Sequence, residues 1–298
     1  MNSSSLSPDL EAKLLDLIRR STSTQTVLKP EKLPDRLQAL RSSAFVRTKQ
    51  RPLSGIRVVL FDIYGTLFSS RAGDIGTEVT VNRAAPAGSG DVQAASYFQR
   101  AVFERHLELF AETPYPEVQV DEIWASYPGR PQNITSFEYA LRYELDHNPA
   151  FPMPGALDCI QQLREVGLPL GIVSNAQFYT PLLFKAFFSA APEQLGFSEV
   201  LIAYSYHFGR AKPAPELFEP VLSSLKKQGY QIDECLYVGN DMLNDVYGAK
   251  NVGMRAALFA GDRNSLRLRE DNPLCRDLLP DLVLESLSDL PACLSQAL

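Results

Sequence analysis

The sequence predicts an α/β protein that is built on a parallel sheet and carries a helical domain inserted after the first strand. Two observations lead to this fold class. From residue 57 onward, short apolar segments typical of buried strands alternate with helical patterns, and this order gives right-handed crossovers between parallel strands. The alternation is interrupted between residues 67 and 168, where a loop-like segment is followed by helical patterns. We therefore expect a Rossmann-like core with an inserted cap.

The sequence of residues 1–55 predicts a helical arm. Ser7–Asp9 is a good helix start, with a capping serine followed by a proline at the first helical position. Leucine and isoleucine then recur on one helical face between residues 10 and 18, and residues 31–41 are expected to form a second helix. Nothing in this arm carries chemistry. The sequence leaves open whether the arm packs on its own chain or on a second copy in a homodimer.

Five segments are expected to form the sheet, because each has a short apolar body of the kind found in buried strands. They are RVVLFD (57–62), PLGIVSN (169–175), VLIAYS (200–205), CLYVGND (235–241) and RAALFAGD (255–262). The helices predicted among them are Ala156–Val166, Tyr179–Phe188, Pro215–Gln228 and Asp245–Val252. Ligands bind beyond the carboxyl ends of parallel strands. The polar residues expected at that edge are Asp62, Ser174, Asn175, Asn240 and Asp241.

The inserted segment opens with a stretch rich in Gly, Ala and Ser. Helical patterns follow at about 91–112, 120–127 and 134–147. A domain inserted directly after the first strand would lie over the carboxyl edge of the sheet as a cap, and its closure would exclude water. The predicted division of the chain is a helical arm at 1–55, a core domain at 56–68 and 155–298, and the cap at 69–154.

Composition and charge exclude several classes of function. The net charge is −6 and no basic stretch stands out, so we expect neither nucleic acid nor an anionic membrane surface as a partner. No run approaches the roughly 18 apolar residues of a membrane span, and the N-terminus lacks the basic-then-apolar order of a secretory signal. The four cysteines are scattered and the three histidines are isolated. This predicts reduced thiols in a cytoplasmic protein, without a histidine-based metal site or triad.

Four short motifs lie at strand ends or turns of the predicted sheet. They are FDIYGTL (61–67), IVSN (172–175), AKP (211–213) and VGNDMLND (238–245). In their order and placement they resemble the motifs of the haloacid dehalogenase (HAD) superfamily of hydrolases, and the resemblance extends over about residues 55–290. It implies a HAD-like fold and a hydrolase that works through a covalent intermediate.

Asp62 is the candidate nucleophile. A carboxylate held at a strand end beside a cation can attack a substrate and split one difficult step into two easier ones. The Gly65-Thr66 step predicts a tight turn wrapped around a ligand. The resemblance implies that Thr66 orients the nucleophile, that Ser174 hydrogen-bonds an oxygen of the transferred group, and that Lys212 neutralises its charge.

A metal ion is expected beside this nucleophile. Asp241 and Asp245 follow the fourth predicted strand, and near Asp62 their like charges would repel unless a cation were present. A set of oxygen ligands favours Mg²⁺. The resemblance suggests Asp62, the backbone carbonyl of Tyr64 and Asp241 as the ligands, with Asp245 supporting them. Many family members carry an aspartate at the position of Asn240, which is the alternative to Asp241.

Tyr64 stands where the family's phosphatases usually carry a second aspartate, which protonates the leaving oxygen and then activates water. A tyrosine with an ordinary pKa of about 10 is a poor substitute at neutral pH. General acid–base catalysis contributes roughly 10²–10⁴-fold, so its loss predicts a slow enzyme that favours good leaving groups. Asp74 or Glu78 of the cap is a candidate for the missing acid. Tyr64, Gly65 and Asn175 are expected to contact the substrate, a small anionic molecule.

Two other functions remain open. In 2-haloacid dehalogenases the first motif also carries tyrosine, and halide is a good leaving group that needs no proton. Those enzymes also need no metal. They have a tyrosine six residues after the lysine of the third motif, where this chain has Phe218. Their fourth motif replaces the first acid with a Ser/Asn-type pattern, whereas Asp241 and Asp245 are both present here. The arginine that would hold a substrate carboxylate is Arg71, Arg83, Arg100 or Arg105. A non-catalytic protein that binds a phosphorylated ligand or a partner would keep the same pocket.

The function expected from the sequence is a Mg²⁺-dependent phosphatase. It would act on a small phosphorylated molecule through an aspartyl-phosphate intermediate on Asp62.

Overall fold

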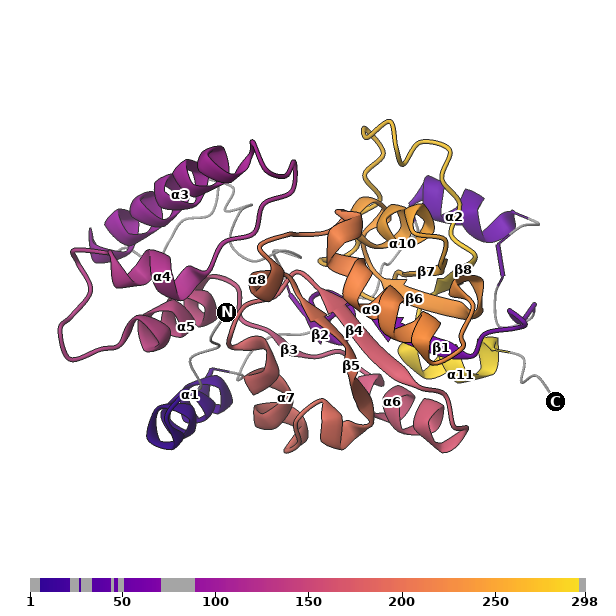
Figure 1. Ribbon diagram of the computed structural model, residues 1–298, viewed down its shortest axis with the longest axis horizontal. Helices are drawn as coiled ribbons and strands as arrows, with labels where there is room; N and C mark the ends of the chain where they lie inside the picture. The colour runs from indigo at the N-terminus through magenta and orange to yellow at the C-terminus, as the bar shows by residue number, and fades with distance from the viewer. Residues whose placement is uncertain are drawn as a thin grey trace.

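The core of the protein is a sheet of six strands in the order β5-β4-β1-β6-β7-β8, and every neighbouring pair is parallel (Figure 1). The computed structural model describes residues 6–21, 27, 34–43, 46–47, 51–70 and 89–294. The strands are β1 (Val58–Phe61), β4 (Leu170–Ser174), β5 (Phe197–Tyr204), β6 (Cys235–Gly239), β7 (Arg255–Phe259) and β8 (Leu282–Leu284). The predicted α/β class with a parallel sheet is confirmed, and β8 is an additional strand.

Helices cover both faces of the sheet. Alternate residues of each strand point to opposite faces, so apolar side chains on each face need their own cover. The helices of the core are α2 (Asp35–Ser42), α6 (Ala156–Glu165), α7 (Thr180–Phe188), α9 (Pro215–Lys227), α10 (Gly248–Asn251) and α11 (Leu290–Cys293). On one side Val59 and Phe61 of β1 share a hydrophobic cluster with α6, α7 and α11. On the other side Val58 and Leu60 share one with α2, α9 and α10. This double cover explains why the strands are apolar on both faces.

Short helical segments connect these elements. They are α8 (Ser205–Phe208), the 3₁₀ turns η1 (Glu193–Leu195), η2 (Ile232–Glu234) and η4 (Leu287–Asp289), and the π-helical turn η3 (Met242–Tyr247). The helix predicted at Asp245–Val252 begins earlier in the structure and is regular only in its second half. The chain first makes the wide turn η3, and regular α-helix is limited to α10.

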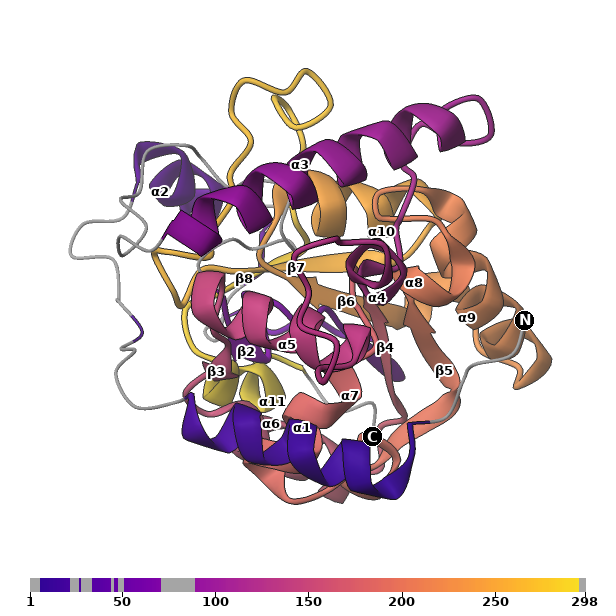
Figure 2. The ribbon, with the colours of Figure 1, turned by 90° about the vertical axis from the view of Figure 1, so that its left-hand side faces the viewer.

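Three helices of the inserted segment lie together on one side of the sheet (Figures 1 and 2). They are α3 (Ser89–Leu109), α4 (Val120–Ala125) and α5 (Ser136–His147). They meet around Trp124, whose ring stacks on Phe98 with centroids 5.1 Å apart and also contacts Tyr143 at 4.7 Å. Aromatic side chains bury large areas, so this cluster fixes how the three helices pack.

The inserted segment leaves and re-enters the core through one narrow connection. β2 (Phe68–Ser69) pairs with β3 (Phe151–Pro152) in a two-stranded antiparallel ribbon. The two crossings therefore lie side by side, as a hinge between two bodies requires. The domain boundaries at 69 and 154 stay a prediction, and this ribbon supports them.

The N-terminal arm packs on its own chain in the described residues. The side chain of Ser7 caps α1 (Pro8–Arg20) by accepting a hydrogen bond from the backbone N–H of Leu10 (3.3 Å). α1 lies along both α5 and α7 (Figure 2). Lys13 forms an ion pair with Glu138 of α5 (2.7 Å), and Glu11 forms one with Lys185 of α7 (2.6 Å). The arm thus fastens the inserted helices to the core.

Two further findings concern the surroundings of the protein. Among the described helices, none is both long and apolar enough to cross a membrane. All four cysteines are free thiols in buried positions, as predicted, and the cytoplasmic location inferred from them stays a prediction.

Candidate active site

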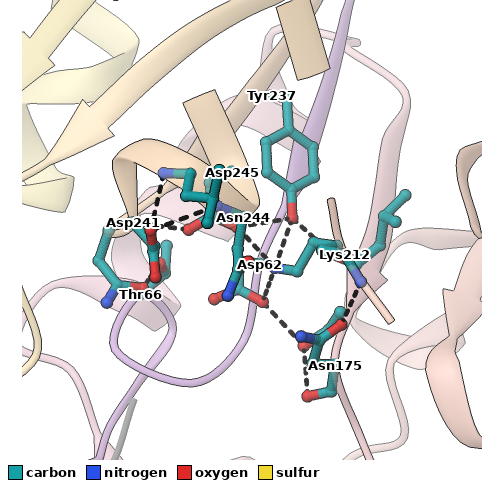
Figure 3. Close-up of polar contacts among 12 residues, drawn as sticks. Asp62, Thr66, Asn175, Lys212, Tyr237, Asp241, Asn244 and Asp245 are labelled. Carbon is teal, nitrogen blue, oxygen red and sulfur yellow. Dashed lines mark hydrogen bonds and ion pairs between the residues drawn. The ribbon is translucent and has the colours of Figure 1, made fainter. Parts of the chain in front are cut away.

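Asp62 lies at the carboxyl end of the central strand β1. Its side chain is buried, and Oδ1 accepts hydrogen bonds from the hydroxyl of Ser174 (2.8 Å) and from Nζ of Lys212 (2.7 Å) (Figure 3). Ser174 ends β4, which pairs with β1 in parallel register. Because parallel strands end at the same edge, the sheet brings the first two motifs together. The third motif reaches them from the loop before α9.

Lys212 is the centre of this polar cluster. Besides Asp62, its Nζ donates to Oδ1 of Asp245 (2.6 Å) and to the hydroxyl of Tyr237 (3.0 Å), so all three ammonium protons have an acceptor. Burial lowers the pKa of this lysine, but the negative charges of Asp245 and Asp62 raise it by more than burial lowers it. As a result, its pKa lies well above the ordinary value. Lys212 is therefore cationic at neutral pH. The side-chain oxygen of Asn175 accepts a hydrogen bond from the backbone N–H of Lys212 (2.7 Å).

The fourth motif is shaped by its two aspartates. Oδ1 of Asp241 accepts the backbone N–H groups of Leu243 (2.8 Å) and Asn244 (3.2 Å), as a helix N-cap does. Oδ2 of Asp245 accepts the backbone N–H of Asp241 (2.9 Å). Burial raises the pKa of Asp245 to about 7, and the neighbouring ammonium group opposes this rise. These bonds explain why the chain makes the wide turn η3 here.

Two glycines allow close approach at this site, Gly239 within the fourth motif and Gly65 between the first and fourth motifs. A Cβ atom on Gly239 would lie 2.2 Å from Cγ of Asp245, so only glycine fits there. Gly65 has a left-handed backbone with φ +86°, and a Cβ atom on it would lie 2.5 Å from Nδ2 of Asn240. The tight turn expected from Gly65-Thr66 is present. The hydroxyl of Thr66 donates to Oδ1 of Asn240 (3.3 Å), and its role in orienting the nucleophile stays a prediction.

The Tyr64 side chain is not part of the lining of either cavity at this site, and its contact with the substrate stays a prediction. It is buried, and its hydroxyl shares a hydrogen bond with Oγ1 of Thr180 (2.9 Å). Burial, with a further contribution from Glu144, raises the pKa of Tyr64 well above its ordinary value. Tyr64 is therefore neutral, and in the described part of the chain its hydroxyl contacts Thr180 rather than Asp62 or Lys212. Gly65 lies against the side chain of Asn240, and its contact with the substrate likewise stays a prediction.

Replacing Tyr64 with phenylalanine tests this placement. We expect Tyr64→Phe to change kcat/KM by less than about twofold, because the hydroxyl contacts Thr180 and not the reacting groups. The free energy of unfolding should fall by about 1 kcal/mol, the usual loss for one hydrogen bond. Steady-state kinetics and urea unfolding measure the two effects. A tenfold loss of kcat/KM would show that the hydroxyl takes part in the reaction.

Glu144 lies in the same buried region and gives a pH-dependent prediction. It accepts a hydrogen bond from Nδ2 of Asn148 (2.8 Å), and burial raises its pKa to about 7. The folded protein therefore holds this proton more tightly than the unfolded chain, and the free energy of unfolding falls as pH rises from about 4.5 to about 7. Glu144→Gln should remove up to about 3 kcal/mol of that fall. Urea unfolding at pH 4.5 and pH 8 measures it, and equal curves for both proteins would contradict it.

Three of the four predicted metal ligands, Asp62, Asp241 and Asp245, border one small cavity, and Tyr64 is not part of its lining. The cavity has a volume of about 10 Å³, and its lining is formed by Asp62, Asn175, Lys212, Asn240, Asp241, Asn244 and Asp245. This is room for a single water-sized species. Carboxylate and amide oxygens are suitable ligands for Mg²⁺, so the donor set fits the ion. In the described part of the chain, however, no three His, Cys, Asp or Glu side chains converge as a metal site, and Asp245 is engaged by Lys212.

The two candidates from the fourth motif differ in their partners. The amide of Asn240 accepts from Thr66 and donates to the backbone carbonyl of Ser265 (2.5 Å). Asp241 instead forms a two-point ion pair with Arg269, whose Nε and Nη2 lie 3.0 Å and 2.7 Å from Oδ2. The Asn240 amide is occupied by the Thr66 hydroxyl and the Ser265 carbonyl, whereas Asp241 brings a negatively charged carboxylate to the cavity. Asp241 is thus the better candidate.

Sequence reasoning missed two members of the site. Tyr237 looks like an ordinary core residue of β6, yet its hydroxyl donates to the carbonyl of Val173 (2.5 Å) and contacts Lys212 (Figure 3). A tyrosine within an otherwise apolar buried strand was the available signal, since a buried hydroxyl needs a partner. Arg269 reaches Asp241 from the long loop after β7, and no local pattern predicts that contact.

Several predicted candidates have other placements. Asp74, Glu78, Arg71 and Arg83 lie outside the described residues. Arg100 and Arg105 lie on α3, exposed, and pair with glutamates one turn along the same helix. The described arginine at the pocket is Arg269 instead.

Comparison with known proteins gives one family match, two relatives and one solved structure. The family model described as "Hydrolase: haloacid dehalogenase-like hydrolase" matches residues 56–253. The chain is 30% identical over 176 residues to a glyceraldehyde 3-phosphate phosphatase of Pyrococcus abyssi, covering 52% of this chain and 68% of that one. It is 25% identical to a ribulose-1,5-bisphosphate 5-phosphatase of Halopiger xanaduensis, covering 66% and 72%. The structure of L-2-haloacid dehalogenase from Xanthobacter autotrophicus aligns with a TM-score of 0.47 at 21% identity, covering 79% and 97%.

Proposed function

Because the chain belongs to the haloacid dehalogenase-like hydrolase family, we propose that it is a phosphatase that hydrolyses a small phosphate monoester through Asp62. The observation that carries this proposal is the position of the Asp62 carboxylate, which meets Ser174, Lys212 and the cavity at Asp241 at one sheet edge. Relatives at 25% and 30% identity that are named as phosphatases support it.

The residues of the site divide the reaction into two steps. A carboxylate oxygen of Asp62 attacks phosphorus, and the bond from phosphorus to the leaving oxygen breaks. Water then attacks phosphorus, which breaks the bond to Asp62 and releases phosphate. Lys212 supplies fixed positive charge beside the attacking group, and Ser174 supplies a hydrogen-bond donor. Because Tyr64 replaces a carboxylic acid, esters whose leaving oxygen needs no proton are favoured.

Charge supports Mg²⁺ as the cofactor. Asp62, Asp241 and Asp245 bring three negative charges when ionised, and Lys212 and Arg269 bring two positive ones. The site is therefore one charge negative before a phosphate group arrives, and a divalent cation would offset the excess. The residues that would hold it are Asp62, Asp241 and the backbone carbonyl of Tyr64, with Asp245 supporting them through the backbone N–H of Asp241. When bound, the ion would stabilise charge on the transferred group.

A 2-haloacid dehalogenase is the second candidate, and one contact favours it. Phe218 lacks the hydroxyl expected at that position of a dehalogenase, but its ring packs edge-on against Tyr237 at 5.5 Å. The hydroxyl of Tyr237 in turn lies beside Lys212. The absence of a tyrosine at residue 218 therefore counts less against a dehalogenase than the sequence alone indicated.

One set of assays separates these functions. Purified protein is given p-nitrophenyl phosphate and 2-chloropropionate side by side, with Mg²⁺ and with EDTA. We expect phosphate release that requires Mg²⁺ and no chloride release. Chloride release in EDTA would overturn the phosphatase. A folded protein that turns over neither compound, nor a wider panel of phosphate esters, would favour a binding protein.

Isotope labelling in ¹⁸O water gives a second, independent distinction. In the phosphatase, water attacks phosphorus, so a single turnover puts the label into phosphate and leaves the Asp62 peptide unlabelled. In the dehalogenase, water attacks the carbonyl carbon of the ester on Asp62, so the label enters that carboxylate. Mass spectrometry of the peptide that contains Asp62 reads out the difference.

A further inference from the structure

A larger cavity continues from the reaction site toward the inserted helices. Its volume is about 490 Å³, within the range of roughly 300–1,000 Å³ that is usual for small-molecule pockets. At the core end it is bounded by Asn175, Lys212 and Asn244, which also line the small cavity at Asp62. The two spaces therefore share a wall. A molecule with its phosphate at Asp62 would extend into the larger one.

The far wall of this cavity is apolar. It is formed by one face of α3 and the residue after it, with the side chains of Phe98, Val102, Phe103, Leu107 and Phe110. Phe98 and Val102 are buried within the inserted segment. In contrast, Phe103, Leu107 and Phe110 are 62%, 60% and 62% exposed. Large apolar side chains left this exposed and gathered over a pocket are typical of a binding surface. Figure 2 shows α3 lying across this side of the molecule.

Apart from His106, the polar side chains of the cavity, which include Tyr115, Glu117, Gln177 and Arg269, lie away from the wall formed by α3. His106 is the polar side chain that α3 contributes to the lining. Glu117 lines it too, but its carboxylate already accepts the hydroxyl of Ser205 (2.5 Å) and the amide of Gln177 (3.3 Å). Each hydroxyl of a bound polyol needs a hydrogen-bond partner to offset its loss of water. The wall of α3 supplies apolar contact instead.

The chemistry at Asp62 points to the same kind of molecule. Residue 64 supplies no carboxylic acid, so the esters best served are those whose leaving oxygen can depart as an anion without a proton. A phenol has an ordinary pKa of about 10, against about 15.7 for water, so a phenolate leaves far more readily than an alkoxide. An aromatic leaving group would both fill the apolar cavity and need the missing acid least.

We propose that the substrate is a phosphate monoester with an apolar, aromatic body, which packs against Phe103, Leu107 and Phe110 while its phosphate lies at Asp62. This assignment rests on the proposed function for the position of the phosphate. The apolar wall itself is independent of whether the bound ester is hydrolysed.

Binding of two non-hydrolysable probes tests the assignment. Naphthylmethylphosphonate and methylphosphonate share a charged head and differ in the apolar body. Isothermal titration should show at least about tenfold tighter binding of the naphthyl compound. Phe103→Gln and Leu107→Gln, both at exposed positions, should reduce that advantage about tenfold. Val200→Gln removes a valine that is 58% exposed and lies outside the cavity, and it should leave the advantage unchanged. Equal binding of the two probes, or an advantage that survives both α3 substitutions, would overturn the assignment.

Kinetics then separate this inference from the proposed function. The wild-type protein should hydrolyse 2-naphthyl phosphate with at least about tenfold higher kcat/KM than glycerol 3-phosphate. Preferred binding of the naphthyl probe without hydrolysis of any ester would sustain the apolar site and reject the phosphatase. Hydrolysis of both esters with equal kcat/KM, and equal binding of the probes, would sustain the phosphatase and reject the aromatic substrate.

Discussion

Asp62→Asn is expected to lower kcat for p-nitrophenyl phosphate by at least about 10³-fold, since an amide cannot attack phosphorus and form the covalent intermediate. The side chain is nearly isosteric with aspartate, and its oxygen can still accept from Ser174 and Lys212. We therefore expect the protein to stay folded. Phosphate release measured against thermal unfolding of the same sample distinguishes loss of chemistry from loss of structure.

A matched variant at the other edge of the sheet controls for charge. Asp281 also pairs with a lysine, Lys250 (2.9 Å), but it precedes β8 and so lies at the amino ends of the parallel strands. Asp281→Asn should retain kcat within about threefold. If Asp62→Asn kept a tenth of the wild-type rate, or if both variants lost activity together, Asp62 would not be the nucleophile.

The parts of the fold that follow from the sequence are those fixed by burial pattern. Val58–Phe61 is apolar throughout, so it was recognisable as a central strand covered on both faces, and Asp62 then had to lie at its carboxyl end. Ser174 follows from the same rule applied to β4. For these residues, the strand register alone determines which side chains meet.

The direction of a side chain in a turn does not follow from such a pattern. Tyr64 lies after β1, where strand alternation no longer applies, and its ring enters the buried region at Thr180 instead of the pocket. The tyrosine at residue 64, which made the reaction uncertain in the sequence, thus has its side chain outside the lining of the cavities. It stands in place of an aspartate that would act as an acid, and the motif FDIYGTL does not indicate another residue for that role.

Long-range contacts are the second limit. Arg269 meets Asp241 because the loop after β7 folds back over the fourth motif, where Met242 donates its backbone N–H to the carbonyl of Arg267 (2.9 Å). Tyr237 reaches Lys212 across the space between β6 and the third motif. Neither contact has a sequence spacing that predicts it, because each depends on how separate segments pack.

Lys212→Met should have the largest effect on stability. Methionine nearly matches the length of the lysine stem, but it leaves the carboxylates of Asp62 and Asp245 buried without their shared cation. Breaking a buried ion pair in this way costs about 3–5 kcal/mol, which urea unfolding measures directly. Lys250→Met removes a lysine whose side chain is 30% exposed and pairs with Asp281, and it should cost less than about 1 kcal/mol. Similar losses for the two variants would mean that the buried cluster has no special role in stability.

A second substitution shows whether the loss comes from uncompensated charge. In the wild-type background, Asp245→Asn should destabilise the protein, because Lys212 loses one of its two carboxylate partners. In the Lys212→Met background, the same change removes one of two unpaired buried carboxylates, and we expect it to restore about 1–3 kcal/mol. The effect of Asp245→Asn thus reverses its sign. Phosphate release should not return in the double variant, because the cation beside Asp62 is still missing. Additive losses of stability would instead assign the role of Lys212 to packing, and recovered activity would remove it from the reaction.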